Sequence, residues 1–369
     1  MHIAVLTSAH PRFDIRVFVK ECRSLVAAGH RVTLVVADGL GNTSRDGVEV
    51  LDVGKATGRA GRMTQSVWRV LRAAFRLDAD AYHFHDPELI PVGLLLRLAD
   101  RMVVYDVHED VPLQILSKPW IRPWLRKCIS RTFEALENFA VARFSAVVAA
   151  TPTIRDRFLP HNPNTVDVNN FPILEELTPA ADWHQKERAV CYIGGITRVR
   201  GIMEALGAID KTDATLLLAG AFNETSLEAT AKAAPGWQKT EFAGMLDRQG
   251  VASLLGRAKV GLVTLHPIPN YLDALPIKLF EYMAAGIPVI ASDFPLWRQI
   301  VEDAACGVCV DPMDIEATAS AMTTLLSDDE RARQMGMSGR RAVEQKYQWA
   351  NEARKLASLY ETLKPGVHA

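Results

Sequence analysis

The sequence predicts an α/β protein made of two Rossmann-like domains, each built on a parallel sheet. Its 369 residues exceed what one typical core accommodates, so two domains are expected. In the first half, short apolar strands alternate with helical stretches, as a parallel sheet requires. Near residue 189 the same alternation starts again. Because such sheets bind ligands at their strand ends, loops of both domains are expected to face one cleft.

The first half supplies the elements of the first domain. Short apolar runs predict strands at 2–7, 31–37, 48–53, 81–84, 102–106, 145–149 and 165–168. Helical spacing of apolar residues predicts helices near 15–28, 63–77, 87–99, 121–142 and 152–159. The stretch from Asn169 to Trp183 contains proline and is weakly patterned, which is typical of a hinge. The first domain is therefore expected to span residues 1–170.

The second half supplies the second domain, expected at 171–346. Its predicted strands are 189–193, 214–219, 239–242, 259–264, 287–291 and 307–310, with helices between them. A last helical stretch is expected from about 327 to 362, and it carries Tyr347, Trp349 and Tyr360.

Composition narrows the class of protein. Hydrophobic residues make up 49% of the chain and charged residues 23%, which is typical of a compact soluble protein. The net charge of −1 gives no reason to expect nucleic acid. Five scattered cysteines indicate a reducing cytosol. The N-terminus lacks a signal-peptide core, and no run of 18 apolar residues occurs.

Two segments, 55–77 and 118–131, concentrate positive charge without any acid among the cations. The first contains Lys55, Arg59, Arg62, Arg69, Arg72 and Arg76. The second contains Lys118, Arg122, Arg126, Lys127 and Arg131, with Trp120 and Trp124 among them. Each predicted helix also has an apolar stripe. This pattern is typical of docking to an anionic membrane surface, although core-packed helices with solvated polar faces are an alternative.

Segment 276–290 predicts a helix with a ligand at its N-terminus. Pro276 suits a first helical turn, Gly286 ends the helix, and a buried strand follows. An apolar face then leaves Lys278 and Glu281 near the first turns. Free N–H groups and an ammonium suit a diphosphate, and the carboxylate suits a diol. An ordinary crossover helix is the alternative interpretation.

A glycine loop opens the second domain. Gly194 and Gly195 follow the strand 189–193, and Arg198 and Arg200 come next. The loop lacks the Gly-x-Gly-x-x-Gly spacing of a nicotinamide site. Bare backbone allows a phosphate to approach closely, and the arginines can bond it. Surface arginines on a loop are the alternative.

The first domain has two clusters of histidines and carboxylates at predicted strand ends. One is His83-Phe-His85-Asp86, and the other ends in His108-Glu109. Strand alternation places His83 and His85 on one face, and single histidines of this kind are usually structural. Asp86 and Glu109 are candidates for binding hydroxyl groups of a ligand, which is the acceptor in the reaction implied by the resemblance described next.

These segments resemble glycosyltransferase family four, whose members are retaining enzymes of the GT-B fold. The resemblance covers nearly the whole chain and is strongest over 187–310. It implies two Rossmann-like domains that face one interdomain cleft, with the acceptor bound by the first and the nucleotide sugar by the second. It also implies a terminal helix, about 347–369, that crosses back to the first domain. The implied reaction moves a sugar from a UDP- or GDP-type donor to an acceptor hydroxyl with retention.

The resemblance assigns the donor residues of the second domain. Glu281 matches the family glutamate that binds the donor ribose, and Asp273 stands where the family has another glutamate. Arg200 stands where a family lysine binds the diphosphate. Gly195 replaces the family arginine, for which Arg198 is a candidate substitute.

Further donor contacts are implied by position. The family loop corresponding to 242–247 contacts the base through its backbone, which suggests Met245 and Leu246. The start of the helix adds Lys278 and Leu279. In the first domain, His108 matches the histidine that lies against the donor sugar, so His108, Asp273 and Glu281 are the catalytic candidates.

The opening loop resembles a subset of the family. That subset has a His-Pro and an Asp-x-Arg here, which makes His10, Asp14 and Arg16 candidates for the acceptor site. A structural N-cap at Asp14 is an equal alternative.

No metal and no cofactor is expected. Asp78-Ala-Asp80 is similar to the metal motif of the other glycosyltransferase fold, but it falls at the wrong end of the sheet. Cations and a helix end are expected to hold the leaving diphosphate instead.

The expected acceptor is a lipid-linked saccharide in cell-surface polysaccharide assembly, with the protein peripheral on the inner face of the cell membrane. Two alternatives stay open. One is a nucleotide-sugar epimerase of the same fold. The other is a non-catalytic subunit that binds donor, and it stays open because Gly195 and Asp273 differ from the residues that the family has at these positions.

Overall fold

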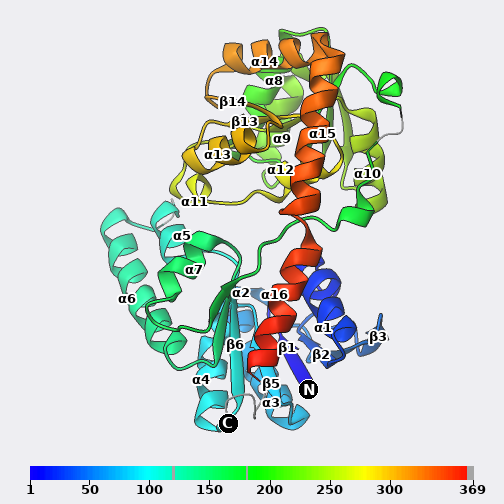
Figure 1. Ribbon diagram of the computed structural model, residues 1–369. Helices are drawn as coiled ribbons and strands as arrows, with labels where there is room; N and C mark the ends of the chain where they lie inside the picture. Colours follow the sequence, from blue (N-terminus) through cyan, green and yellow to red (C-terminus); the bar gives the residue numbers. More distant parts are fainter. Residues whose placement is uncertain (119–120, 180–181, 364–369) are drawn as a thin grey trace. The chain divides into compact units, whose positions relative to one another are not determined.

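The structure is a computed structural model that describes residues 1–118, 121–179 and 182–363 (Figure 1). The chain divides into two compact units. Unit 1 comprises Met1–Asn170 together with the chain from Ala350 onward, and unit 2 comprises Phe171–Trp349. Each unit is an α/β structure on its own sheet.

The sheet of unit 1 has the strand order β3-β4-β2-β1-β5-β6-β7-β8. The strands are β1 (His2–Leu6), β2 (Arg31–Val36), β3 (Thr43–Arg45), β4 (Val48–Asp52), β5 (Ala81–Phe84), β6 (Met102–Val107), β7 (Ala146–Ala149) and β8 (Thr165–Asp167). All neighbouring pairs are parallel except β3 and β4. The sequence did not predict β3, because its three residues are exposed and carry no apolar signal.

The helices of unit 1 lie between these strands, and the last one comes from the end of the chain. They are η1 (Ile15–Cys22), α1 (Arg23–Ala27), α2 (Gly58–Gly61), η2 (Arg62–Ser66), α3 (Val67–Leu77), η3 (Pro87–Leu89), α4 (Ile90–Leu98), α5 (Val111–Ser117), α6 (Pro123–Val141), α7 (Pro152–Phe158) and α16 (Trp349–Thr362).

The sheet of unit 2 is parallel throughout and has the order β11-β10-β9-β12-β13-β14. Its strands are β9 (Ala189–Ile193), β10 (Thr215–Ala219), β11 (Thr240–Gly244), β12 (Val260–Val263), β13 (Val289–Ser292) and β14 (Gly307–Val310). Each predicted strand of this half is confirmed within about two residues.

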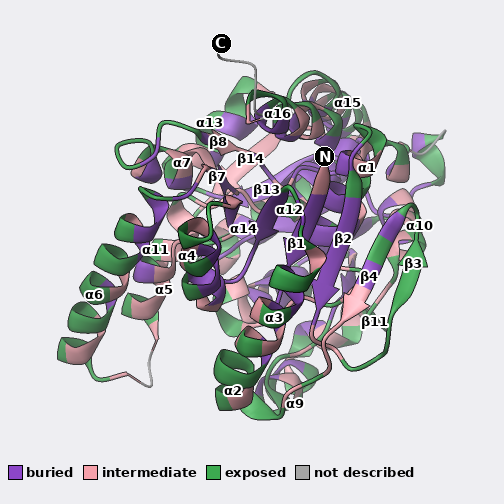
Figure 2. Cartoon of the chain, turned by 90° about the horizontal axis from the view of Figure 1, so that it is seen from below, coloured by how far each residue is buried: buried purple, intermediate pink, exposed green. Residues whose placement is uncertain are grey.

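The helical segments of unit 2 cover both faces of its sheet. They are η4 (Leu174–Glu176), η5 (Trp183–Gln185), η6 (Arg198–Arg200), α8 (Ile202–Asp210), α9 (Thr225–Ala233), η7 (Pro235–Lys239), α10 (Arg248–Arg257), α11 (Pro269–Leu272), α12 (Ile277–Ala284), α13 (Pro295–Asp303), α14 (Ile315–Ser327) and α15 (Asp329–Gln345). Along β9, Cys191 belongs to one apolar core and Tyr192 to the other, because successive side chains point to opposite faces. Figure 2 shows β1 and β2 in the sheet of unit 1 as buried and the edge strand β3 as exposed.

The helical stretch predicted over 327–362 consists of two helices, α15 and α16, and α16 begins close to the start predicted for the terminal helix. The chain leaves helical geometry between them, at Lys346 (φ −125°). The amide of Trp349 donates instead to the carbonyl of Pro172 (2.8 Å). The break lies at the boundary between the units, and α16 completes unit 1.

Each sheet has one point where the chain reverses its direction of travel across the strands. In unit 1 this point lies between β1 and β5, and in unit 2 between β9 and β12. The loops that leave the carboxyl ends of two such strands diverge, which opens space for a ligand. Within the described residues, no helix is both long and apolar enough to cross a membrane.

Candidate functional site

The loops at the β9–β12 switch point of unit 2 lie in close contact. A Cβ atom on Gly201, whose φ is +75°, would stand 2.0 Å from the carbonyl oxygen of Thr264. A Cβ on Gly220 would stand 1.9 Å from that of Gly194. Glycine is therefore required at both positions. Gly201 lets the 194–201 loop approach the segment that follows β12, and Gly220 lets the segment that follows β10 approach the same loop.

Arg200 takes the space beside Gly195. Its Nη1 lies 3.5 Å from the Gly195 carbonyl oxygen, and a Cβ on Gly195 would come within 2.8 Å of the same nitrogen. An arginine at position 195 would therefore compete with Arg200 for this space. Arg198, the predicted substitute, is exposed.

Lys278 places an unpartnered ammonium at this edge of the sheet. Among the described residues its Nζ has no hydrogen-bond partner, and almost none of that atom is exposed. It lies 3.9 Å from the centre of the Tyr192 ring, so a cation–π contact is its main stabilisation. Burial, and then the charge of Arg200, lower the pKa of Lys278 to about 7.

Other buried polar atoms without partners follow the same two strands. In the described part of the chain they include Thr197 Oγ1, Glu204 Oε2, Thr264 Oγ1, His266 Nε2 and Asn270 Oδ1. His266 Nε2 and Glu204 Oε2 are 3.1 Å apart, but their alignment does not make a hydrogen bond. Buried polar atoms normally have partners, so this concentration indicates a ligand site.

Glu281 lies on α12 with only 7% of its surface exposed. Its Oε1 accepts from Arg248 Nη1 (2.6 Å), while Arg248 Nε donates to Glu176 Oε2 (2.7 Å). Sequence reasoning missed Arg248. The only local signal is that Arg248 follows Asp247, which caps α10 through the amide of Gly250.

The remaining donor candidates occupy different environments. Asp273 is exposed at the end of α11, and Met245 is 75% exposed. Leu246 is half-buried against the core. Leu279 does not fit its assignment, because its side chain is fully buried in the core and its amide donates to Pro276. Arg200, Lys278 and the glycine loop do come together, as predicted.

In unit 1, Asp86 holds the loop that follows β1. Its Oδ2 accepts from Thr7 Oγ1 (2.7 Å) and from the amide of Ser8 (2.6 Å). His10 lies between two carboxylates, with Nδ1 3.5 Å from Asp14 Oδ2 and Nε2 3.6 Å from Asp86 Oδ1. Burial opposes protonation of His10, but Asp14 and Asp86 outweigh it and raise the pKa.

Two acceptor candidates have structural roles instead. Asp14 caps η1, because its Oδ1 accepts from the amides of Arg16 (2.8 Å) and Val17 (2.9 Å), and these bonds together with His10 lower its pKa to about 2 despite burial. Arg16 is buried, and it donates to Val168 O (3.0 Å) and Asp106 (3.0 Å). The prediction that Arg16 binds the acceptor is therefore wrong for its side chain, whose guanidinium is turned into the unit.

His108 is linked to the interior by another histidine. Its Nε2 lies 3.0 Å from His85 Nδ1, and its ring centre is 4.9 Å from that of His10. Its side chain is 20% exposed. Burial lowers the pKa of His108 well below its usual value, so the imidazole is neutral near pH 7. Glu109 is exposed and is not part of this group.

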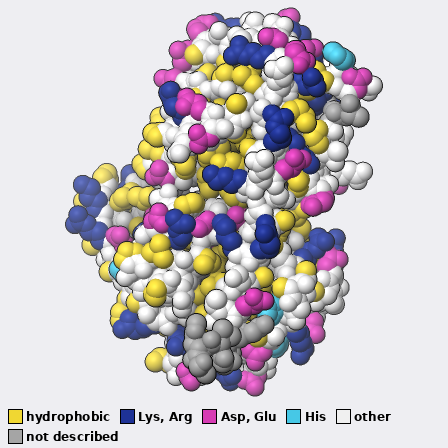
Figure 3. Space-filling view, in the orientation of Figure 1, with side chains coloured by type: hydrophobic (Ala, Val, Ile, Leu, Met, Phe, Trp, Pro, Cys, Tyr) yellow, Lys and Arg dark blue, Asp and Glu magenta, His cyan; other side chains and the backbone are white. Residues whose placement is uncertain are grey.

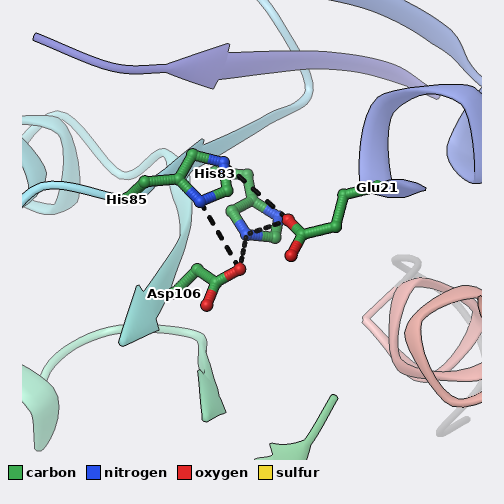
Figure 4. Close-up of side chains that lie close together, drawn as sticks. All are labelled: Glu21, His83, His85 and Asp106. Atoms are coloured by element: carbon green, nitrogen blue, oxygen red, sulfur yellow. Dashed lines mark ion pairs between the residues drawn. The ribbon is translucent and has the colours of Figure 1, made fainter. Parts of the chain in front are cut away.

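Beneath His108 lies a buried cluster of four side chains, which Figure 4 shows turned toward one another: Glu21, His83, His85 and Asp106. Burial, and then Asp106, raise the pKa of Glu21 well above its usual value. Burial lowers the pKa of His85 to about 4. By contrast, the rejected metal motif is occupied by protein groups, since Asp78 accepts from Arg101 and Asp80 from the amide of His2.

The two basic segments carry exposed aromatic residues. Trp68 on α3 is 58% exposed and Trp124 on α6 is 67% exposed, and Phe75 is exposed as well. Figure 3 shows cations beside apolar side chains at the left, at the end of the α5–α6 pair. The apolar stripe of the second segment has no fully buried member, whereas Val70 and Ala74 of the first segment are buried in the core. The stripe consists of Ile121, Trp124, Leu125, Cys128 and Ile129. Trp120 lies outside the described residues.

Comparison with known proteins covers both units. Residues 175–342 match the family model for glycosyl transferases group 1, and residues 16–169 match that for the glycosyl transferase 4-like domain. The phosphatidyl-myo-inositol mannosyltransferase of Mycobacterium leprae is 26% identical over 306 residues, which is 80% of this chain and 76% of the relative.

Solved structures show the same fold. Sucrose-phosphate synthase from Thermosynechococcus elongatus has a TM-score of 0.79 at 19% identity, with 98% of each chain covered. Anabaena HepE, solved in complex with UDP-glucose, has a TM-score of 0.73 at 15% identity, with 98% of this chain and 100% of that chain covered.

Proposed function

The chain belongs to the group 1 glycosyltransferases, and we propose that it transfers a sugar from a UDP- or GDP-type donor to the hydroxyl of a lipid-linked saccharide, with retention. The loops at the β9–β12 switch point of unit 2 form the donor site in this proposal.

The unpartnered ammonium of Lys278 is the observation that carries the donor site. A shielded cation without a hydrogen-bond partner is costly, and Arg200 next to it adds like-charge repulsion. A diphosphate removes both costs because it brings negative charge and acceptor oxygens. Both cations lie beside the glycine loop and the start of α12, where backbone amides also favour an anion.

The reaction breaks the bond between the anomeric carbon and the diphosphate oxygen, and the electron pair leaves with the diphosphate. Arg200 and Lys278 stabilise that developing charge, which is the role of fixed cations in such steps. The acceptor oxygen bonds to the same face of the sugar, and its proton passes to the departing phosphate oxygen. His108 and Asp273 orient the sugar, and Glu281 binds the ribose. No divalent cation is required in this scheme, so added Mg²⁺ or Mn²⁺ should leave turnover unchanged.

Donor binding can be tested by thermal shift with UDP, GDP and dTDP and their common sugars. One nucleotide should raise the melting temperature of the wild type, and Lys278→Gln should abolish the shift. Lys259→Gln is a matched control. Lys259 is also buried, but its Nζ donates to Asp329 Oδ1 (2.6 Å), and it lies at the amino end of β12, away from the loops at the carboxyl end. If no nucleotide shifts the wild type, or if both variants respond as the wild type does, the proposed donor site is wrong.

The proposed lipid acceptor rests on the exposed basic and aromatic residues of unit 1. Arg122, which precedes α6, and Trp124 and Lys127 on α6 are exposed, so an anionic surface can reach them. The relative from Mycobacterium leprae is named for phosphatidyl-myo-inositol, which is itself a lipid. We therefore place the protein at the inner face of the cell membrane, as a peripheral protein.

Flotation with liposomes tests this placement. The protein should float with anionic vesicles and much less with neutral ones, and Trp124→Ala combined with Lys127→Gln should weaken flotation. Arg333→Gln with Arg341→Gln removes two exposed cations of α15 and serves as the control. Equal binding to both kinds of vesicle, or equal loss in both double variants, would contradict the membrane assignment.

A further inference from the structure

We propose that Glu21, His83, His85 and Asp106 bind a structural Zn²⁺ ion inside unit 1. Glu21 lies in η1, His83 in β5 and Asp106 in β6, while His85 directly follows β5, and each side chain offers one ligand atom within 4.8 Å of the others. Two imidazole nitrogens and two carboxylate oxygens are a ligand set that Zn²⁺ accepts. This inference does not depend on the proposed function.

The spacing of the atoms fits a cation better than it fits hydrogen bonds. His83 Nε2 lies 3.5 Å from Asp106 Oδ2 and 3.8 Å from Glu21 Oε2. His85 Nε2 also lies 3.8 Å from Glu21 Oε2. Four ligands at zinc distances of roughly 2.0–2.2 Å stand about 3.3–3.6 Å apart at the corners of a tetrahedron. The widest separation of 4.8 Å means that the ligands must close in slightly on the ion.

Several buried nitrogen and oxygen atoms of this cluster also lack hydrogen-bond partners within the described chain. Among the described residues, His83 Nε2, His85 Nε2 and both oxygens of Glu21 are buried without a hydrogen-bond partner. The other nitrogen of His83, Nδ1, lies 2.8 Å from the Tyr360 hydroxyl, whereas His85 Nδ1 lies 3.0 Å from His108 Nε2 and also 3.4 Å from Asp106 Oδ2. Metal-binding histidines characteristically use one nitrogen for the ion and fix the other by a hydrogen bond.

The charge of the cluster is not balanced by its own residues. Arg16 is its basic residue, with Nε 3.0 Å from Glu21 Oε1 and Nη2 3.0 Å from Asp106 Oδ1. With neutral imidazoles, one guanidinium against two carboxylates leaves −1 in a buried place, and Zn²⁺ would change this to +1, so the geometry and not the charge carries the proposal. Arg16 engages Oε1 of Glu21 and leaves Oε2 toward the histidines, so it does not fill the proposed site. A proton on Glu21 is the competing way to remove the charge.

An ion here would act on His108 through His85. With His85 Nε2 on the metal, His85 Nδ1 carries the hydrogen and donates to His108 Nε2. His108 then keeps its own hydrogen on Nδ1. The ion would also join β5 and β6 to η1, and through Tyr360 to α16. It is thus a structural ion that orients His108, and no step of the transfer reaction passes through it.

Metal analysis of the full-length protein without a polyhistidine tag tests this. We expect about one zinc per chain, and after exchange to Co²⁺ the visible absorption of a four-coordinate site. Glu21→Gln and His85→Gln should each lose the metal, whereas His161→Gln, which removes an exposed imidazole, should retain it. Removing zinc with a chelator should lower the melting temperature of the wild type but not that of Glu21→Gln.

The Co²⁺ spectrum of the wild type does not depend on whether a variant folds. Substoichiometric zinc with no four-coordinate Co²⁺ spectrum would overturn the proposal and favour a protonated Glu21. The same conclusion would follow if Glu21→Gln bound zinc as the wild type does.

Discussion

The switch-point edges of the two sheets differ in whether their polar side chains have hydrogen-bond partners within the protein. In unit 1, Asp86 accepts from Thr7 and from Ser8, so the loop after β1 is closed by its own bonds. In unit 2, Lys278 has a shielded ammonium without a hydrogen-bond partner among the described residues. A satisfied edge contributes to stability, whereas an unsatisfied one costs free energy that a ligand can recover. The loop after β1 in unit 1 is therefore held by its own hydrogen bonds, whereas the β9–β12 edge of unit 2 keeps an ammonium that a ligand could satisfy.

The largest effect is expected at Arg200. Arg200→Ala should lower turnover by about 10²–10³-fold while the fold persists, because a fixed charge at a departing diphosphate is lost. Arg198→Ala is the matched control, since Arg198 is exposed two residues earlier and should change turnover little. Steady-state kinetics of both variants decide the point. If the two losses are equal, Arg198 does replace the missing family arginine, and the edge of unit 2 uses both cations.

In unit 1, Asp86 should matter for stability rather than for donor binding. Asp86→Ala leaves Thr7 Oγ1 and the Ser8 amide without their acceptor, so we expect a loss of about 3 kcal/mol in the free energy of unfolding. Urea denaturation measures this loss, and the Kd for nucleotide should stay unchanged. Glu109→Ala, which removes an exposed carboxylate, should change neither quantity. A normal unfolding free energy in Asp86→Ala would remove the contrast between the two edges.

Glu281 tests the ribose contact of unit 2. Glu281→Gln keeps the shape of the side chain but weakens a charge-assisted hydrogen bond, so nucleotide affinity should fall by about 1.5–3 kcal/mol. The loss should be specific to the diol. Wild-type protein should prefer UDP or GDP over the matching 2′,3′-dideoxy nucleotide, and the variant should not. A variant that still prefers the diol would show that the Arg248–Glu281 pair is purely structural.

The sequence was sufficient for the fold because strand and helix signals are local. The inner strands β9, β10, β12 and β13 of unit 2 are buried on both faces and read as continuous apolar runs, and Gly286 with φ +69° marks the end of α12. The break before α16 has no local signal, since Lys346 to Gln348 carries no proline or glycine, and the terminal helix from about 347 was expected only from the family resemblance. The acceptor there for the Trp349 amide is the carbonyl of Pro172, which is distant in sequence.

The residues of the site could be predicted only where a local sequence motif identifies them. Lys278 and Arg200 were identified from helix and loop signals, but Arg248 was not, because its partners Glu176 and Glu281 lie 72 and 33 residues away. The burial of Arg16 was also missed. An Asp-x-Arg after a strand does not reveal that its arginine turns inward to Asp106, which lies 90 residues later.

The smallest predicted effect is a pH dependence that belongs to unit 2 alone. In the free protein, burial and Arg200 hold the pKa of Lys278 at about 7, whereas an unfolded lysine has a pKa near 10.5. A bound diphosphate raises the folded pKa again, so binding at pH 8 should take up nearly one proton and binding at pH 6 almost none. Nucleotide affinity should therefore fall at most about tenfold per pH unit above pH 7.

Calorimetry in buffers of different ionisation enthalpy measures this uptake directly. Lys278→Gln should bind weakly with no proton uptake, and Lys259→Gln should keep the wild-type profile. The stability of the free protein should change in the opposite sense. Because the folded pKa of Lys278 is depressed, the unfolded chain binds the extra proton between about pH 7 and 10.5, and stability from this group rises with pH across that window. Lys278→Gln should thus be more stable than the wild type at pH 6, with the gain shrinking toward pH 10. If the wild type takes up no proton on binding nucleotide at pH 8, Lys278 is already charged in the free protein. The contrast drawn between the two sheet edges would then be wrong.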